Sequence, residues 1–177
     1  MYFNNENIYY VGLFGYNFSG TIKNVGIIDS YFKGRQWVGS VCGNNINGII
    51  TNSYNTGSVS GSSSFIGGVC GDNYSKIENS YNTGSVSGLK DYVGGVCGYN
   101  SSNSTIENCY NTGSVSGSSS FIGGVCGYNS SNSTIENSYY NNSVYSGKDV
   151  GYNNGTVNKV SGKTSEQFAS GEVAYLL

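Results

Sequence analysis

The chain of 177 residues contains no proline and no histidine, and only 10% of its residues are charged. Without histidine, Ser-His-Asp and Cys-His catalytic arrangements and the zinc-binding H-E-x-x-H motif are excluded. The net charge of −2 provides no long-range field that would attract nucleic acid or an anionic membrane. No apolar run approaches the ~18 residues of a transmembrane helix. We therefore expect neither nucleic-acid binding nor membrane insertion by this segment.

The N-terminus also lacks a recognisable targeting signal. Met1-Tyr2-Phe3-Asn4 does not follow the basic, apolar and small-residue order of a signal peptide. Because the sequence starts and stops abruptly, we expect it to be part of a larger polypeptide.

What the sequence has in abundance is repetition. Residues 62–71 recur unchanged as residues 118–127, and residues 98–108 recur as residues 127–137. The heptapeptide Asn-Thr-Gly-Ser-Val-Ser-Gly occurs three times, at residues 55–61, 82–88 and 111–117. A repeat period in the twenties is typical of a solenoid. The regularly spaced apolar residues argue against disorder, although Gly and Ser are frequent.

Aligning the units produces columns of similar residues. An aromatic column contains Tyr9, Trp37, Phe65, Tyr92 and Phe121, and the next position contains Tyr10, Val38, Ile66, Val93 and Ile122. A third column contains Phe14, Cys42, Cys70, Cys97 and Cys126, and a fourth contains Ile22, Ile50, Ile77, Ile106 and Ile135. Further columns are Asn24, Asn52, Asn79, Asn108 and Asn137, then Tyr54, Tyr81, Tyr110 and Tyr139, then Val59, Val86, Val115 and Val144.

The spacing between columns shows where the length of a unit varies. From the Ile column to the next aromatic column the distance is 15 residues in all four complete cases, whereas the Cys-to-Ile distance varies from 7 to 9. Packed segments resist insertion and exposed loops tolerate it, so one turn of each coil protrudes. Short β-branched segments between Gly, Asn and Ser turns predict three strands per unit, roughly 65–71, 77–82 and 85–87. Coils stacked in register would lie ~4.8 Å apart.

Alternation along the first strand suggests which face is inward. It places Ile66, Gly68 and Cys70 on one face, and Phe65, Gly67 and Val69 on the other. We expect the first set to be inside, because a stack of cysteines is more plausible buried. A bend at the paired glycines would change this assignment.

The cysteines do not resemble a metal site or a disulfide framework. There are five, and the four in one column are 28, 27 and 29 residues apart, without a C-x2-C pair. We predict that Cys70, Cys97 and Cys126 are buried, reduced and unliganded, like small apolar residues.

The tail differs in character from the repeats. Thr164-Ser165-Glu166-Gln167 resembles a capping box, and two helical turns broken near Gly171 are expected after it. We therefore predict a solenoid over residues 1–160 with degenerate first and last coils, and a C-terminal cap or the start of a following domain over residues 161–177.

Two columns are candidates for a ligand-binding face. Stacked carboxylates could raise a pKa or hold a cation, or could simply form a solvated face. Stacked tyrosines could form a platform for sugars if exposed, or could pack within the wall of the coil. The candidate residues are Glu78, Glu107 and Glu136, with Tyr81, Tyr110 and Tyr139. The Asn column is expected to be structural, because Asn tolerates left-handed turns and its amides can hydrogen-bond along a stack.

The units Val-Gly-Gly-Val-Cys-Gly-Tyr-Asn and Thr-Ile-Glu-Asn-Cys-Tyr-Asn-Thr-Gly-Ser-Val-Ser-Gly resemble the GLUG repeat over roughly residues 9–160. Such repeats occur in large bacterial surface and secreted proteins, including IgA-cleaving metalloproteases and haemagglutinin-like adhesins. The resemblance implies an all-β fold, a right-handed parallel β-helix of about five coils of 27–29 residues, in an extracellular or cell-surface protein. It supplies no catalytic residue.

The function expected from the sequence is a non-catalytic repeat domain of a bacterial surface or secreted protein, acting as an adhesin wall or structural spacer. The alternative is a carbohydrate-binding or carbohydrate-active β-helix that uses the Glu and Tyr face. No cofactor or metal is expected. The expected partners are glycans or proteins of host or bacterial surfaces.

Overall fold

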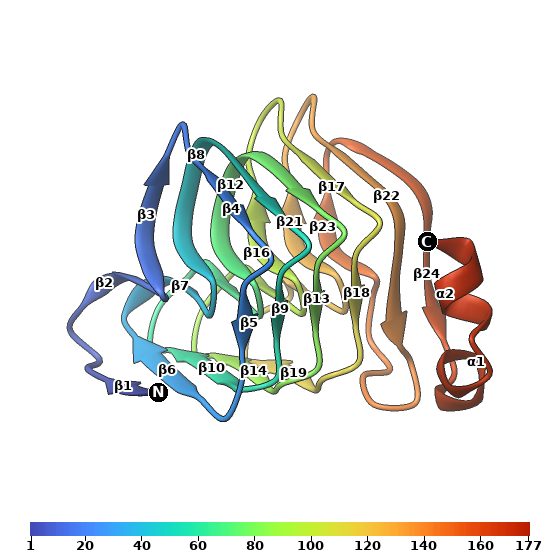
Figure 1. Ribbon diagram of the computed structural model, residues 1–177, viewed down its shortest axis with the longest axis horizontal. Helices are drawn as coiled ribbons and strands as arrows, with labels where there is room; N and C mark the ends of the chain where they lie inside the picture. Colours follow the sequence, from blue (N-terminus) through green and yellow to red (C-terminus); the bar gives the residue numbers. More distant parts are fainter.

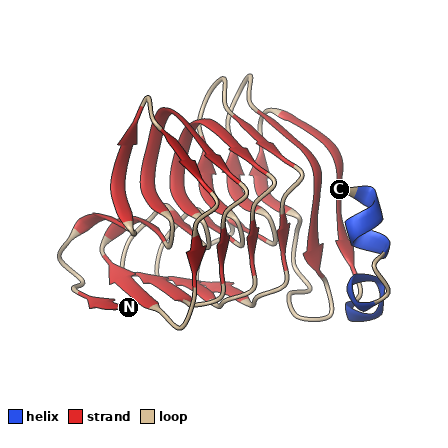
Figure 2. Cartoon of the chain, viewed as in Figure 1, coloured by secondary structure: helices blue, strands red, loops and turns tan.

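Successive repeats stack as parallel strands, so that each coil lies beside the same residues of the next one (Figures 1 and 2). The computed structural model describes all residues from 1 to 177. Its strands form a β-solenoid of about five coils, and the only helices are two short ones at the C-terminus. The predicted all-β solenoid is therefore confirmed.

Three sheets run along the solenoid. The first contains β1 (Tyr2–Asn4), β6 (Tyr31–Gly34), β10 (Ser58–Gly61), β14 (Val86–Gly88) and β19 (Val115–Gly117). The second contains β2 (Tyr9–Val11), β7 (Gln36–Gly39), β11 (Ile66–Gly67), β15 (Val93–Gly94) and β20 (Ile122–Gly123). The remaining strands form one large sheet: β3 (Phe14–Phe18), β4 (Thr21–Lys23), β5 (Gly26–Ile27), β8 (Cys42–Thr51), β9 (Tyr54–Asn55), β12 (Cys70–Glu78), β13 (Tyr81–Asn82), β16 (Cys97–Asn100), β17 (Thr105–Glu107), β18 (Tyr110–Asn111), β21 (Cys126–Asn129), β22 (Thr134–Asn141), β23 (Val150–Asn153) and β24 (Thr156–Lys163).

The register of these strands follows most of the predicted columns. Cys70 lies between Cys42 and Cys97 in register. The Ile column pairs in the same way along the large sheet, and four of its members have no exposed surface: Ile50, Ile77, Ile106 and Ile135. Because each apolar side chain stacks on its equivalent, the core is a continuous column along the solenoid axis.

The paired glycines bend the chain and change the predicted inward face. Ile66 and Cys70 are buried as expected, but Val69, which strict alternation placed outside, is fully buried as well. β11 ends at Gly67 and β12 begins at Cys70, so no single strand covers residues 65–71. A Cβ atom on Gly67 would clash with the carbonyl oxygen of Cys70, which explains why glycine is required at this corner.

A second predicted strand, residues 77–82, is interrupted at Asn79. The φ angle of Asn79 is 49°, and the whole Asn column has positive φ: Asn24, Asn52, Asn79, Asn108 and Asn137. The predicted left-handed turn at this column is confirmed. In the three middle coils the chain therefore turns a corner here before the short Tyr-Asn strands β9, β13 and β18.

The first coil is aligned differently from the prediction. Tyr9 lies opposite Gln36, and Val11 lies opposite Val38. Tyr10 therefore occupies the place of Trp37, and both residues have a φ angle of 56°. The initial alignment was wrong by one residue, because the positive φ angle shared by Tyr10 and Trp37 cannot be read from the sequence, and the buried residue that matches Val38 is Val11.

The last coil also departs from a predicted column. Val59, Val86 and Val115 are buried, but Val144 is exposed and lies beyond the end of β22. The Val column therefore has three members from these repeats, to which β6 adds Phe32 in register with Val59.

The C-terminal segment covers one end of the solenoid (Figure 1). β24 pairs along β22 as far as Lys163, and α1 (Ser165–Ala169) and α2 (Glu172–Leu176) follow. Thr164 and Gln167 form the expected capping box, and Gly171 has a φ angle of 83° between the helices. Neither helix is long and apolar enough to span a bilayer.

All five cysteines are buried with free thiols: Cys42, Cys70, Cys97, Cys109 and Cys126. Burial raises the pKa of Cys97, and it raises the pKa of Cys109 to about 12. The thiolate is the reactive form, so the raised pKa protects Cys97 and Cys109 in addition to burial, and burial alone keeps a reagent from all five thiols. We expect a thiol-specific reagent to label none of them in the native protein at neutral pH, and all five after denaturation without reductant. Fewer than five reactive thiols in the denatured protein would contradict this expectation.

The interior also contains a ladder of asparagine side chains that the sequence analysis missed. Each Nδ2 donates to the Oδ1 of the next member at 2.7–2.9 Å, through Asn17, Asn45, Asn73, Asn100, Asn129 and Asn153. A shorter ladder joins Asn55, Asn82 and Asn111 at 2.7 and 2.8 Å. The ladders provide hydrogen-bond partners for the buried side-chain amides, and each of these bonds joins two neighbouring coils.

Replacing Asn100 with Ala should lower the free energy of unfolding by about 2–3 kcal/mol, because it leaves buried partners unpaired. Asn100 donates to Asn129 and to the carbonyl of Thr134, and it accepts from Asn73 and Ser104. The matched control is Asn153→Ala at the exposed end of the ladder, where water replaces the lost bonds. Urea unfolding checks the difference, and equal effects would show that the ladder adds no stability.

Candidate functional site

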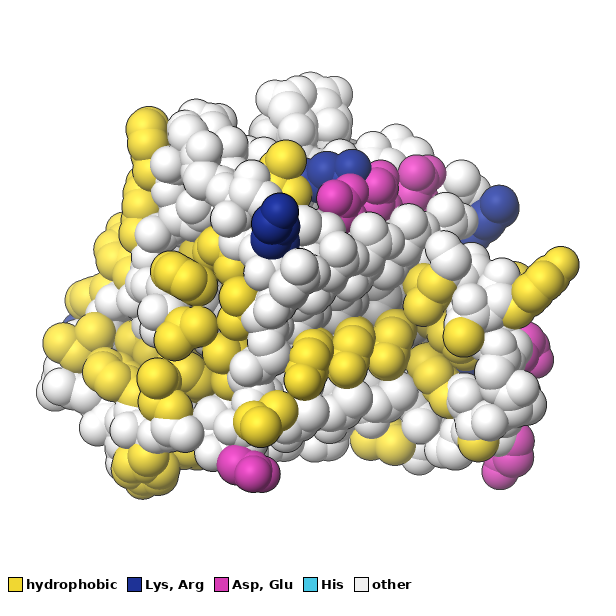
Figure 3. Space-filling view, in the orientation of Figure 1, with side chains coloured by type: hydrophobic (Ala, Val, Ile, Leu, Met, Phe, Trp, Pro, Cys, Tyr) yellow, Lys and Arg dark blue, Asp and Glu magenta, His cyan; other side chains and the backbone are white.

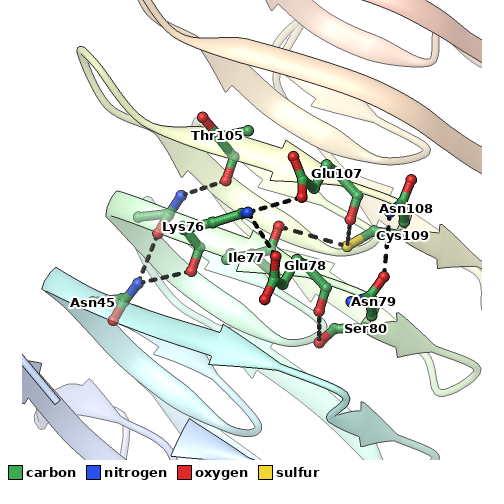
Figure 4. A network of polar contacts seen from close by, with 11 residues as sticks. Asn45, Lys76, Ile77, Glu78, Asn79, Ser80, Thr105, Glu107, Asn108 and Cys109 are labelled. Atoms are coloured by element: carbon green, nitrogen blue, oxygen red, sulfur yellow. Dashed lines mark hydrogen bonds and ion pairs between the residues drawn. The ribbon is translucent and has the colours of Figure 1, made fainter. Parts of the chain in front are cut away.

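The predicted acidic column forms one row on the outside of the large sheet. Glu78, Glu107 and Glu136 lie in register on β12, β17 and β22. Lys76 lies among them, with its Nζ atom 2.6 Å from Glu78 Oε2 and 2.8 Å from Glu107 Oε1 (Figure 4). The row is visible as adjacent acidic and basic side chains in Figure 3.

The ammonium group of Lys76 determines the electrostatics of this row. Hydrogen bonding to Glu107 and Glu78 raises the pKa of Lys76 to about 12, and the same contact holds the pKa of Glu78 below its usual value. The expectation that stacked like charges raise a pKa is therefore wrong for Glu78. The Glu column in the sequence did not include Lys76, which lies two residues before Glu78 and therefore on the same face of the strand.

The predicted tyrosine column forms a shorter strip. The rings of Tyr54 and Tyr81 stack with centroids 5.0 Å apart, and those of Tyr81 and Tyr110 stack at 4.7 Å. Tyr139 is only 4% exposed, so it does not belong to an outward platform. Phe168 of α1 packs on Tyr110 instead, with centroids 5.8 Å apart. The C-terminal segment thus ends the strip.

A cleft of about 230 Å³ lies where the strip meets the helices. It is lined by Thr83, Tyr110, Thr112, Phe168, Val173, Ala174 and Leu177. The sequence did not predict this cleft, because the contact depends on how the tail folds back over the coils.

Another aromatic surface lies beside the second sheet, at the aromatic column. The ring of Trp37 stacks on those of Tyr10 and Phe65, with centroids 4.6 and 5.6 Å apart. Tyr92 and Phe121 continue this row. The sequence identified these residues as a column but assigned them no ligand.

A second row of rings stands at an angle to the first. Tyr99, Tyr128 and Tyr152 stack with centroids 4.8 and 5.2 Å apart, and Tyr99 meets Phe65 and Tyr92 edge to face. We call these two rows the aromatic wall.

The second row of the aromatic wall ends at Asp72. Asp72 lies in register between Asn44 and Tyr99, and the three following coils carry Tyr99, Tyr128 and Tyr152 at this position. Its side chain is buried, and Ser101 Oγ donates to its Oδ1 at 2.9 Å. Burial raises the pKa of Asp72 to about 7, against the opposing effect of Ser101. Asp72 stands out in the sequence because it replaces the tyrosine of the Gly-Tyr-Asn pattern. The sequence does not show that its side chain is buried.

The comparisons with known proteins agree with this architecture. The pattern described as the GLUG motif matches residues 36–60 and 91–116. The chain contains GLUG repeats. Each match begins at or just before a strand of the second sheet and ends in the first sheet, so that one motif corresponds to one coil.

The GLUG coils are also similar to a solved structure, that of a candidate immunoglobulin A1 protease from Bacteroides ovatus. The likeness covers 90% of this chain and 69% of that chain, with a TM-score of 0.64 and 22% sequence identity. It shows a shared fold. No curated protein matches the sequence.

The coils present two kinds of surface chemistry. The Glu row is neutralised in part by Lys76, and its side chains project from one flat sheet. The Tyr strip and the aromatic wall present ring faces and hydroxyl groups in regular order. Such surfaces are suited to binding through stacking and hydrogen bonds.

Proposed function

We propose that the chain is a non-catalytic repeat domain of an extracellular or cell-surface protein, in which it acts as a rigid spacer or an adhesive wall. The GLUG repeats and the shared fold support this proposal. The register continues from coil to coil, and inner asparagine ladders join the coils, so the domain suits a load-bearing rod.

The arrangement of the acidic row supports the proposal that the domain is not catalytic. Enzymes that cleave glycosidic bonds place two carboxyl groups about 5–9.5 Å apart across the scissile bond. Here Glu78 and Glu107 lie side by side on one sheet and share the same ammonium group, that of Lys76. Neither carboxylate faces a second one across a cleft, and the lowered pKa of Glu78 makes it a poor general acid.

A second candidate function is carbohydrate binding through the Glu and Tyr face. The observation that favours it is the parallel stacking of Tyr54, Tyr81 and Tyr110, whose rings form a half-exposed strip near the acidic row. Figure 3 shows a row of hydrophobic side chains running along this face of the solenoid. Sugars present apolar C–H faces that such rings can cover.

Two measurements test the main proposal. An antibody against the purified chain should label intact cells that produce the parent protein, and mild protease treatment of those cells should remove the signal. The purified chain should release no new reducing ends from plant, bacterial or mucin polysaccharides. Labelling only after cell lysis would overturn the surface location, and release of reducing ends that Glu107→Gln abolishes would overturn the non-catalytic role.

A further inference from the structure

At Asp72 the second row of the aromatic wall lacks a ring on one side of Tyr99. Tyr99 stacks on Tyr128 through one face, with centroids 4.8 Å apart, and the coil on its other side carries Asp72 in place of a ring. Another aromatic side chain at that position would therefore lie at a similar distance from Tyr99. The Asp72 side chain is short and buried, and it provides no ring to stack on Tyr99.

A pocket of about 310 Å³ lies beside Tyr99. It is lined by Phe65, Tyr74, Tyr92, Tyr99, Ser101 and Ser102. The volume is at the lower end of the ~300–1,000 Å³ typical of small-molecule sites. The lining combines ring faces with hydroxyl groups, and it contains no cationic side chain.

We propose that this pocket binds one neutral pyranose ring of a glycan, which takes the place of the missing aromatic ring and stacks on Tyr99. The inference goes beyond the spacer role and gives the adhesive role a defined ligand class. It concerns a different face from the Tyr strip.

The hydroxyl groups of the pocket are arranged to bind a polyol. Ser101 Oγ donates its only proton to Asp72, so its lone pairs remain free to accept from a sugar hydroxyl group. Tyr74 and Ser102 are exposed and also line the pocket, and Ser102 Oγ shares a hydrogen bond with Ser130 Oγ at 3.2 Å. Their hydroxyl groups can donate to or accept from a sugar. The buried carboxylate thus orients Ser101 without itself contacting the sugar.

The charge around the pocket selects against acidic sugars. No Lys or Arg lines it, and the Asp72 carboxyl group lies directly beneath Ser101. A uronic acid or sialic acid would bring its carboxylate near the Asp72 carboxyl group, and no cation lines the pocket to pair with it. A neutral hexose or N-acetylhexosamine meets only rings and hydroxyl groups.

Saturation-transfer NMR on the whole 177-residue chain tests the proposal. The probes are the methyl glycosides of glucose, galactose, mannose and N-acetylglucosamine, with methyl glucuronide and methyl sialoside as acidic comparators. We expect transfer from the aromatic protons to the C–H face of at least one neutral glycoside. The acidic comparators should bind at least about tenfold more weakly.

Two variants close the pocket in different ways. Asp72→Tyr places a ring on the open side of Tyr99, as Tyr128 lies on its other side. Ser102→Trp blocks the opening from an exposed position, so its effect does not depend on repacking. Each should weaken binding at least about tenfold while the circular dichroism spectrum is unchanged. Tyr81→Ala on the Tyr strip is the matched control and should bind as the parent does.

The outcomes separate this proposal from the others. Binding that both pocket variants lose and Tyr81→Ala keeps would support the pocket. Binding that only Tyr81→Ala loses would overturn it in favour of the Tyr strip. The absence of binding by every neutral glycoside would also overturn it, and would leave the surface location and spacer role to the cell-labelling experiment.

Discussion

Replacing Ile106 with Asn is expected to lower the free energy of unfolding by about 3–5 kcal/mol, the largest effect of any single change considered for this chain. Ile106 has no exposed surface and lies between Ile77 and Ile135 in register. The substitution removes apolar contacts with both neighbouring coils and buries an amide among side chains that offer no hydrogen bond. Because stability in a stacked array comes from its interfaces, both interfaces weaken at once.

The matched control is Ile22→Asn in the first coil. Ile22 pairs in register only with Ile50, and it is 6% exposed. Its loss affects one interface, and the end of a one-dimensional array opens at low cost, so we expect about 1–2 kcal/mol. Urea unfolding of both variants beside the parent provides the comparison. Equal destabilisation would show that stability does not depend on stacking along the Ile column.

Much of this fold was predictable because the repeats place like residues in register. A parallel stack requires each side chain to pack on its equivalent, so a sequence column becomes a spatial column, as Cys70 with Cys97 and Ile77 with Ile106 show. The constant 15-residue segment identified the part of each coil that cannot change length. The repeat period therefore shows which residues of neighbouring coils pack together, almost as directly as the sequence shows contacts within one coil.

The parts that could not be predicted depend on local backbone geometry. Alternation placed Val69 outside, but the corner at Gly67 and Gly68 turns it inward, and a period-two pattern cannot register such a corner. The first coil was misaligned because Tyr10 and Trp37 share a positive φ angle that is invisible in the sequence. The turn and amide-stack prediction covered only the column that contains Asn79 and Asn108, whereas the buried ladder runs through Asn73 and Asn100, which no column included.

In the candidate site, too, the residues that repeat from coil to coil could be predicted, and the residues that do not repeat could not. Glu78, Glu107 and the stacked tyrosines were found from their columns, because a ligand face in a solenoid repeats with the coil. Tyr139 was included for the same reason, and only the fold of the C-terminal segment shows that it is covered. Asp72 was missed because it breaks the pattern, and a search for repetition overlooks the residue that differs.

The burial of Asp72 is expected to make the free energy of unfolding depend strongly on pH. Burial raises the pKa of Asp72 from its usual 3.8 to about 7. Between these values the folded state binds one more proton at this group than the unfolded state does. The stability should therefore fall as the pH rises from about 4 to about 7, and it should level off above that range. A shift of about three pKa units corresponds to a loss of about 4 kcal/mol.

Asp72→Asn should abolish this loss. An amide at this position keeps an acceptor for Ser101, and it supplies a donor beside Asn44, whose buried Oδ1 atom has no hydrogen-bond partner. Urea unfolding at intervals from pH 4 to pH 8 should show the variant gaining about 4 kcal/mol relative to the parent across the range. The difference between the two proteins removes the contributions of other carboxylates, such as Glu78, whose pKa is lowered and whose effect has the opposite sign. Parallel stability curves would mean that water reaches the Asp72 carboxyl group and that its position in the aromatic wall does not perturb it.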